Sequence, residues 1–254
     1  MIYLFAALGL FAGSFLNVCI DRLPRGESIV KPPSHCASCN RKLGFIDLLP
    51  LISYIWLRGR CRYCNASIPI KIPIVEAATG LLFAFLYWQF GLGLELVIAL
   101  FYTGILLVIF MIDLEHQLVL NIITFPSMGF ALVMSFFWPG VRTFSIFWPQ
   151  VGIESALLGG VVGGALIAVP FILSRGGMGM GDVKLGVLLG LMTGFPYVIM
   201  AVMFSWIGGG LVAAVLLLLK IKGRKEAIPF APFMVSAAFI TLLWGETIYH
   251  WYVR

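Results

Sequence analysis

Long apolar runs with almost no charge constrain this sequence more than any other feature. The stretch 183–219 contains one charged residue, Lys184, and the stretch 151–173 contains only Glu154. A helix needs roughly 20 apolar residues to cross a bilayer, and each of these runs is long enough for at least one crossing. The whole chain is 61% hydrophobic and 11% charged, whereas soluble domains carry about 25% charged residues. We therefore expect an all-α polytopic membrane protein.

The apolar runs predict about eight transmembrane helices. The run 183–219 is long enough for two of them, and the segment "FPYVIM" offers the only modest break, so the boundary at 200/201 is weakly defined. Small residues in "GGVVGGALIAVP" would let the fifth helix approach its neighbours closely. The predicted spans are residues 2–20, 74–92, 95–112, 119–138, 151–173, 183–200, 201–220 and 230–250.

The distribution of positive charge predicts the orientation of these helices. With eight spans, nearly all of the 17 Lys and Arg residues fall on one side, above all in the connection 21–73. Positively charged connections stay in the cytoplasm, so both termini are expected on the periplasmic side of an inner membrane. This asymmetry accounts for the basic pI of about 9.2, and nucleic acid is not an expected partner.

The polar connection 21–73 contains two C-x2-C pairs, Cys36 with Cys39 and Cys61 with Cys64. Four thiolates in two such pairs can surround one Zn²⁺ tetrahedrally. Disulfides are disfavoured because the cytoplasm is reducing, while unrelated thiols or a redox role for one pair remain alternatives. A segment of about 50 residues has too little core to fold easily alone, so we expect a small cytoplasmic zinc-binding segment.

Two aspartates are expected at the cytoplasmic ends of membrane helices. Asp113 ends the third span, and Asp182 opens the sixth after the glycines at 176, 177, 179 and 181. Two nearby carboxylates share a proton, so that one activates water while the other polarises a carbonyl. The glycines would let a substrate backbone approach Asp182. Ordinary helix capping by Asp182 and a solvated helix end at Asp113 remain the alternatives.

Six motifs in a particular order make the chain resemble the type IV prepilin peptidases over nearly its whole length. They are "GSFLNVCIDRLPRGES" (13–28), the paired C-x2-C knuckles, "IKIPIVEAATG" (70–80), "MIDLEHQL" (111–118), "GMGMGDVKLG" (177–186) and "PFAPFM" (229–234). The resemblance implies a multi-pass inner-membrane aspartyl endopeptidase. It would remove the basic leader from type IV prepilins or type II secretion pseudopilins, and then methylate the new N-terminus with S-adenosylmethionine.

The resemblance also implies roles for individual residues. Asp113 matches the first catalytic aspartate, and Asp182 in the G-x-G-D motif formed with Gly179 and Gly181 matches the second. Many members have "LPD" where this chain has "VLN" at 119–121, so Asn121 replaces an acid.

Two further residues are supporting candidates, each with an ordinary alternative. Glu115 sits where some members have another acid, but it is equally well explained as a solvated residue at a helix end. Lys184 follows the second aspartate by two positions, but a positively charged cytoplasmic flank would explain it as well.

The implied organisation has three parts: a first transmembrane helix at 1–20, a zinc-knuckle segment associated with methylation at 21–73, and a seven-helix peptidase domain at 74–254. No individual contact to S-adenosylmethionine is implied. Two other functions stay open: an intramembrane protease without methylation, and a transporter that uses the two aspartates as a proton or cation relay.

Overall fold

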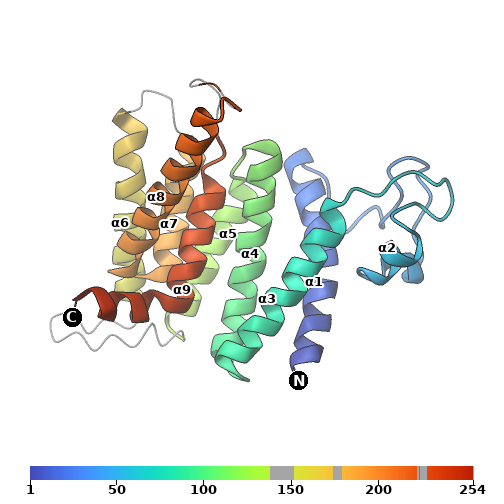
Figure 1. The fold of residues 1–254 in the computed structure, drawn as a ribbon. Helices are drawn as coiled ribbons and strands as arrows, with labels where there is room; N and C mark the ends of the chain where they lie inside the picture. The colour runs from blue at the N-terminus through green and yellow to red at the C-terminus, as the bar shows by residue number, and fades with distance from the viewer. Residues whose placement is uncertain (138–151, 174–178, 222, 224–227, 254) are drawn as a thin grey trace. The chain divides into compact units, whose positions relative to one another are not determined.

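Helices are the only extended regular secondary structure in the part of the chain that the structure describes, and the fold class expected from the sequence is confirmed. It is a computed structural model that describes residues 1–137, 152–173, 179–221, 223 and 228–253. Within them there is no β-strand, only two isolated bridges. The helices are α1 (Ile2–Arg22), α2 (Ile52–Trp56), α3 (Lys71–Phe90), α4 (Leu94–His116), α5 (Asn121–Ser135), α6 (Ile153–Leu173), α7 (Met180–Thr193), α8 (Tyr197–Leu218) and α9 (Ala231–Val253) (Figure 1).

Each of the eight predicted spans overlaps a helix, and the span 183–200 overlaps both α7 and the start of α8, but these helices differ in length. Six of them, α1, α3, α4, α6, α8 and α9, are long and apolar enough to cross a membrane. Helices α5 and α7 have 15 and 14 residues, fewer than the roughly 20 that a straight crossing needs. The ends of two predicted spans, residues 138 and 151, lie outside the described residues.

The predicted boundary at 200/201 is wrong, because the turn between α7 and α8 lies several residues earlier. Helix α7 ends at Thr193, and Gly194 follows with a φ of +72°, which an L side chain rarely adopts. Phe195 and Pro196 complete the turn before α8 starts at Tyr197. The backbone N–H of Phe195 donates to the carbonyl of Ser155 at 3.0 Å, so the start of α6 holds this turn in place.

The chain divides into two compact units, Met1–Val108 and Ile109–Arg254. In the first unit, α1 and α3 pack against each other along most of their lengths (Figure 1). A Cβ added at Gly13 would come within 2.7 Å of the Glu76 backbone, so the two helices approach at small residues. Asn17 donates to the carbonyl of Ile72 at 3.1 Å. Later residues of α1 contact earlier residues of α3, since Gly13 lies against Glu76 and Asn17 bonds Ile72. The two helices are therefore antiparallel.

In the second unit, α6 and α7 form the closest helix pair (Figure 1). A Cβ added at Gly186 would lie 2.8 Å from the carbonyl oxygen of Gly163 and 2.9 Å from the Ile167 side chain. Gly159 and Gly190 face each other in the same way one turn further along. The predicted close approach at "GGVVGGALIAVP" is thus observed, and its partner is the helix that Asp182 opens.

Candidate functional site

The four cysteines of the two C-x2-C pairs come together in the first unit. The sulfur atoms of Cys36, Cys39, Cys61 and Cys64 all lie within 4.8 Å of one another. Cys36 Sγ and Cys64 Sγ, one from each pair, are 3.8 Å apart. Four sulfurs bound tetrahedrally to Zn²⁺ at about 2.3 Å would be separated by about 3.8 Å. The residues present therefore fit a tetrahedral metal centre, as the spacing predicted.

The two cysteine pairs have the same local backbone, which the sequence reasoning missed. In the first pair, Cys36 N–H donates to the Arg41 carbonyl, and Asn40 N–H donates to the Cys36 carbonyl. In the second pair, Cys61 N–H donates to the Ala66 carbonyl, and Asn65 N–H donates to the Cys61 carbonyl. Both asparagines have a left-handed backbone, with φ of 53° and 57°, a conformation that asparagine tolerates better than most residues. The signal was present as the repeated pattern C-x2-C-N.

The electrostatics of the thiols favour a cation among them. Backbone N–H groups of Cys39 and Ser38 lower the pKa of Cys36 to about 6. At Cys64 the backbone N–H of Ala66 acts in the same direction, but desolvation and the neighbouring thiols raise the pKa to about 12. Four thiolates this close together repel one another, and a bound cation removes that repulsion.

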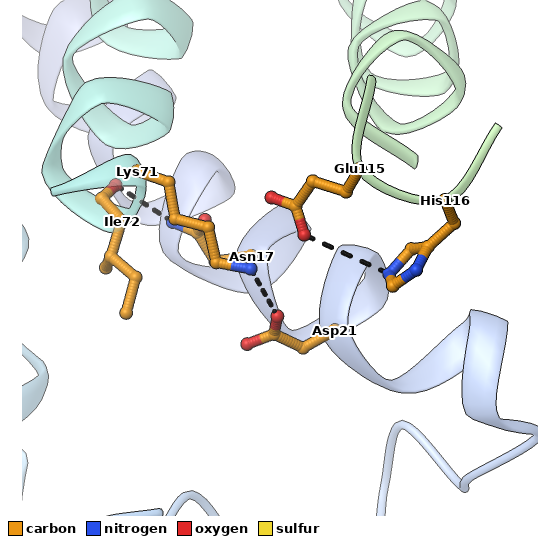
Figure 2. A network of polar contacts seen from close by, with 6 residues as sticks. All are labelled: Asn17, Asp21, Lys71, Ile72, Glu115 and His116. Atoms are coloured by element: carbon orange, nitrogen blue, oxygen red, sulfur yellow. Dashed lines mark hydrogen bonds and ion pairs between the residues drawn. The ribbon is translucent and has the colours of Figure 1, made fainter. Parts of the chain in front are cut away.

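The segment that carries these cysteines is attached to α3 by a buried carboxylate. Glu76 is 5% exposed, and its Oε2 accepts the backbone N–H of Leu51 at 2.9 Å. Close to the start of α3, Lys71 Nζ contacts Asp21 Oδ1 on α1 at 2.8 Å (Figure 2). The motifs at 13–28 and 70–80 therefore form one packed helix pair, a role that sequence reasoning did not assign to them.

In the second unit, Asp113 lies in the last turn of α4 and is 5% exposed. Its Oδ2 accepts the backbone N–H of Ala231 at 3.2 Å. Ala231 is the first residue of α9 and belongs to the motif "PFAPFM". A helix N-terminus carries partial positive charge, so α9 stabilises a negative charge on Asp113.

Asp182 lies in the first turn of α7, ahead of the predicted span 183–200. Its Oδ2 accepts the backbone N–H of Gly179 at 3.2 Å, and its own N–H donates to the Gly179 carbonyl at 3.1 Å. The N-cap position is occupied by Gly179. Asp182 thus contributes to helix capping from inside the helix, and a capping role and a chemical role are compatible at this residue.

Asp113 and Asp182 are close enough to interact electrostatically. Desolvation raises the pKa of Asp182 to about 6, the bond from Gly179 opposes this shift, and the charge of Asp113 adds to it. When two neighbouring carboxyl groups oppose each other's ionisation, one of them stays protonated to a higher pH than it would alone. This arrangement can perform general acid–base chemistry on a bound carbonyl and a water molecule.

The glycines beside Asp182 have different surroundings. A Cβ added at Gly181 would come within 2.9 Å of the Val119 Cβ, so this glycine makes room for Val119. A Cβ at Gly179 would make only ordinary contacts, the nearest at 3.6 Å from Asp182 Oδ2. Of the two glycines, only Gly179 therefore leaves the space beside Asp182 free of a close packing contact. The glycines at 176 and 177 lie outside the described residues.

Each of the two supporting candidates contacts a neighbouring polar side chain. Lys184 Nζ donates to Asn121 Oδ1 at 2.8 Å and lies 5.5 Å from the centre of the Phe125 ring, so it connects the starts of α5 and α7. Glu115 lies on the exposed end of α4, 3.9 Å from His116 Nε2 (Figure 2). The sequence pointed to Asn121 only as a departure from the expected acid, and the structure shows what it contacts.

Two family models together match most of the chain. Residues 7–90 match the bacterial peptidase A24 N-terminal domain, and residues 100–214 match the type IV leader peptidase family. These matched segments contain the four cysteines and both aspartates, respectively. The molecule is a multi-pass membrane peptidase by family and by its six apolar helices.

Curated relatives match the chain almost from end to end. A protein of Stutzerimonas stutzeri is 32% identical over 95% of this chain and 90% of its own length. A relative from Bacillus subtilis is 29% identical over 100% of this chain and 98% of its own length. A relative from Pseudomonas aeruginosa is 30% identical over 97% of this chain and 91% of its own length. All three are named prepilin leader peptidase/N-methyltransferase. The chain belongs to the type IV leader peptidase family. No solved structure matches it.

Proposed function

We propose that this protein removes the leader peptide from type IV prepilins or type II secretion pseudopilins and then methylates the new N-terminal amine. The names of its full-length relatives support both activities. The observation that carries the peptidase assignment is that Asp113 and Asp182 lie at the ends of separate helices in one compact unit, within the segment that matches the type IV leader peptidase family.

The two aspartates divide the work of peptide hydrolysis. The ionised carboxylate takes a proton from water as the water attacks the scissile carbonyl, and the protonated one donates to the carbonyl oxygen. The proton is later passed to the departing amine. Each carboxylate accepts a backbone N–H at the start of a helix, Asp113 from Ala231 and Asp182 from Gly179, so either environment supports the ionised form that acts as the base.

The surroundings of Asp182 suit an extended substrate. Gly179 has no side chain to obstruct it and is exposed, and Asp182 itself is half-buried. The orientation predicted from positive charge puts this end of α7 at the cytoplasmic face. A prepilin would then keep its apolar helix in the bilayer and its basic leader in the cytoplasm, with the scissile bond near the interface.

Zn²⁺ is the metal that fits the four cysteines, and its role here is structural. When bound, it would cross-link the two knuckles and order the segment 21–73, which we assign to methylation. S-adenosylmethionine supplies the methyl group in this proposal. The described residues form no β-sheet of the kind that binds nucleotides in doubly wound folds, and we assign none of them to methyl-donor contacts.

The experiment that tests this function uses the purified full-length protein in detergent, a leader-bearing prepilin and S-adenosylmethionine. Intact-mass measurement should show loss of the leader followed by the gain of one methyl group. An unchanged prepilin mass would reject the proposal, and ion-driven uptake by the reconstituted protein would favour a transporter. Cleavage without methylation would limit the function to a peptidase.

A further inference from the structure

The segment between the two cysteine knuckles exposes large apolar side chains outside every predicted span. They are exposed by 58–81% and are called the apolar patch: Phe45, Ile46, Ile52, Ile55 and Trp56. Phe45 and Ile46 belong to a short 3₁₀ helix, Phe45–Leu48, and the other three belong to α2. These two helices contact each other, so the apolar patch is formed by adjacent turns. Exposed apolar groups of this size mark an interaction surface.

The apolar patch does not cover a core of the segment itself. From Leu23 to Ile70, Pro50 and Cys61 are the only buried residues. The segment is ordered instead by its backbone turns, the four-cysteine site and the bond from Leu51 to Glu76. The exposed apolar side chains therefore need a partner from outside the segment.

Chain connectivity places a bilayer surface next to this segment. It begins after α1, which ends at Arg22, and it ends where α3 begins at Lys71. Both helices are candidate membrane spans, and they are antiparallel neighbours, so both ends of the segment emerge from the same leaflet. The segment 23–70, held at both ends in this way, stays within reach of the headgroups of that leaflet.

The charges beside the apolar patch complement an anionic leaflet. Arg58 and Arg60 are exposed and follow Trp56 by two and four residues. Tryptophan is enriched where membranes meet water, and Lys or Arg near an anionic leaflet stabilises attachment by about 1 kcal/mol each. Short amphipathic elements with this composition lie in the plane of the interface.

We propose that the apolar patch inserts into the boundary between headgroups and acyl chains of the leaflet from which α1 and α3 emerge, with Arg58 and Arg60 binding anionic headgroups. This contact would anchor the four-cysteine site at the membrane surface by a third attachment besides α1 and α3. A second copy of the chain and the apolar helix of a pilin substrate are the alternative occupants, and both can be distinguished from lipid.

Photo-crosslinking identifies the occupant directly. The photoreactive residue p-benzoylphenylalanine is placed at Ile55 or Trp56 in the full-length protein, in nanodiscs of phosphatidylethanolamine and phosphatidylglycerol, with and without a prepilin. Leu81, which is 73% exposed on the membrane helix α3, is the lipid-facing control, and exposed Ser38 in the first knuckle is the polar control. Mass spectrometry of the adducts should show lipid at positions 55 and 56 at yields comparable to Leu81. Adducts mainly with a second copy or with pilin, or lipid yields no higher than at Ser38, would overturn the proposal.

The contribution of charge is tested with a matched pair of double variants carrying the crosslinker at position 56. R58Q/R60Q removes two charges beside the apolar patch, and R25Q/K31Q removes two exposed charges elsewhere in the segment. Lipid adducts formed in phosphatidylglycerol nanodiscs are compared with those formed in phosphatidylcholine nanodiscs. The preference for the anionic lipid should fall by roughly fivefold per charge in R58Q/R60Q. An unchanged preference in R58Q/R60Q, or an equal fall in R25Q/K31Q, would contradict the role of these arginines. The zinc content of each variant checks that it is folded.

Discussion

The four-cysteine site and the two-aspartate site are stabilised by different means. The cysteines lie in a segment in which Pro50 and Cys61 are the only buried residues between Leu23 and Ile70. The aspartates lie at the ends of helices that belong to a packed bundle, and Asp113 is buried. Burial therefore holds Asp113 in place and a bond from Gly179 N–H orients the half-buried Asp182, while the cysteines depend on backbone turns and, in our proposal, on a bound Zn²⁺.

This difference predicts independent failure of the two sites. Metal removal should disorder the cysteine segment without disturbing the helices that carry the aspartates, and changes in helix packing should do the reverse. Each site also lies within one of the two compact units. When one site is altered, the activity of the unaltered site therefore serves as a control in the same molecule.

The largest effect is expected from loss of the metal. The purified protein should contain about one Zn²⁺ per chain, and replacement of all four cysteines by serine should remove it. A structural zinc site contributes about 10 kcal/mol in small zinc-binding peptides, far more than this segment can gain from its few buried residues. Elemental analysis gives the zinc content, and limited proteolysis should show new cleavage confined to residues 21–73.

The serine variant should also lose the two activities to different extents. Its leader peptidase activity should fall much less than its methylation of a pilin supplied already cleaved. Zinc bound equally by the wild-type protein and the serine variant would refute the metal site. An equal loss of both activities would show that the cysteine segment also supports the aspartates.

Next in size is the effect of removing one member of the aspartate pair. Asp113→Asn and Asp182→Asn should each reduce leader cleavage by about 10²–10⁴-fold, the usual contribution of a general acid or base. Both variants should keep their zinc and should still methylate a pilin supplied already cleaved. Cleavage is followed by intact mass, and methylation by transfer of a labelled methyl group.

A matched control for these variants is Glu115→Gln, which removes an acid two residues after Asp113 at an exposed position. It should cleave at close to the wild-type rate. Near-normal cleavage by either aspartate variant would reject the pair as the catalytic groups. A folded Asp182→Asn protein that transfers no methyl group would show that the two activities share a site.

The two sites also differed in how far the sequence could predict them. The C-x2-C pairs are local patterns, so their spacing alone predicted the cluster of Cys36, Cys39, Cys61 and Cys64, and the structure brings these four together. The helices were predictable from apolar length, apart from the turn at Gly194, where a positive φ ends α7 within a continuous apolar run. A hydropathy pattern contains no information on such a backbone conformation.

Contacts between distant segments could not be predicted from the sequence. Nothing in "PFAPFM" indicates that Ala231 N–H binds Asp113, and nothing near Gly181 indicates that Val119 fills the adjacent space. Nothing in "IKIPIVEAATG" indicates that the Glu76 carboxylate accepts the backbone N–H of Leu51. These contacts depend on tertiary packing, which a single sequence does not specify residue by residue.

A smaller effect is expected from tightening the packing of α6 against α7. Gly186→Ala puts a Cβ within 2.8 Å of the Gly163 carbonyl oxygen, and overpacking of this kind costs about 1–3 kcal/mol. Thermal unfolding in detergent should show a lower midpoint, with reduced cleavage and unchanged zinc. The control is Gly210→Ala in α8, where an added Cβ meets nothing within 4 Å, and where alanine favours the helix by about 1 kcal/mol. A lower midpoint for Gly210→Ala than for Gly186→Ala would show that backbone approach does not determine stability here.

The smallest effect concerns the bond between Lys184 and Asn121. This bond joins the first residue of α5 to the second turn of α7, two residues from Asp182. A charged hydrogen bond contributes about 1.5–3 kcal/mol when buried, but Asn121 is exposed and Lys184 only half-buried, so we expect a coupling of about 1 kcal/mol. A double-mutant cycle of Asn121→Ala and Lys184→Met, measured on kcat/KM for leader cleavage, isolates this coupling from the separate effect of each change.

Because the bond positions α7 and contributes no reacting group, kcat/KM of the single variants should fall only several-fold. Asn121→Asp should retain activity by forming an ion pair with the same lysine. If Lys184→Met loses as much activity as Asp182→Asn, or if the two changes are additive, Lys184 does not act through Asn121.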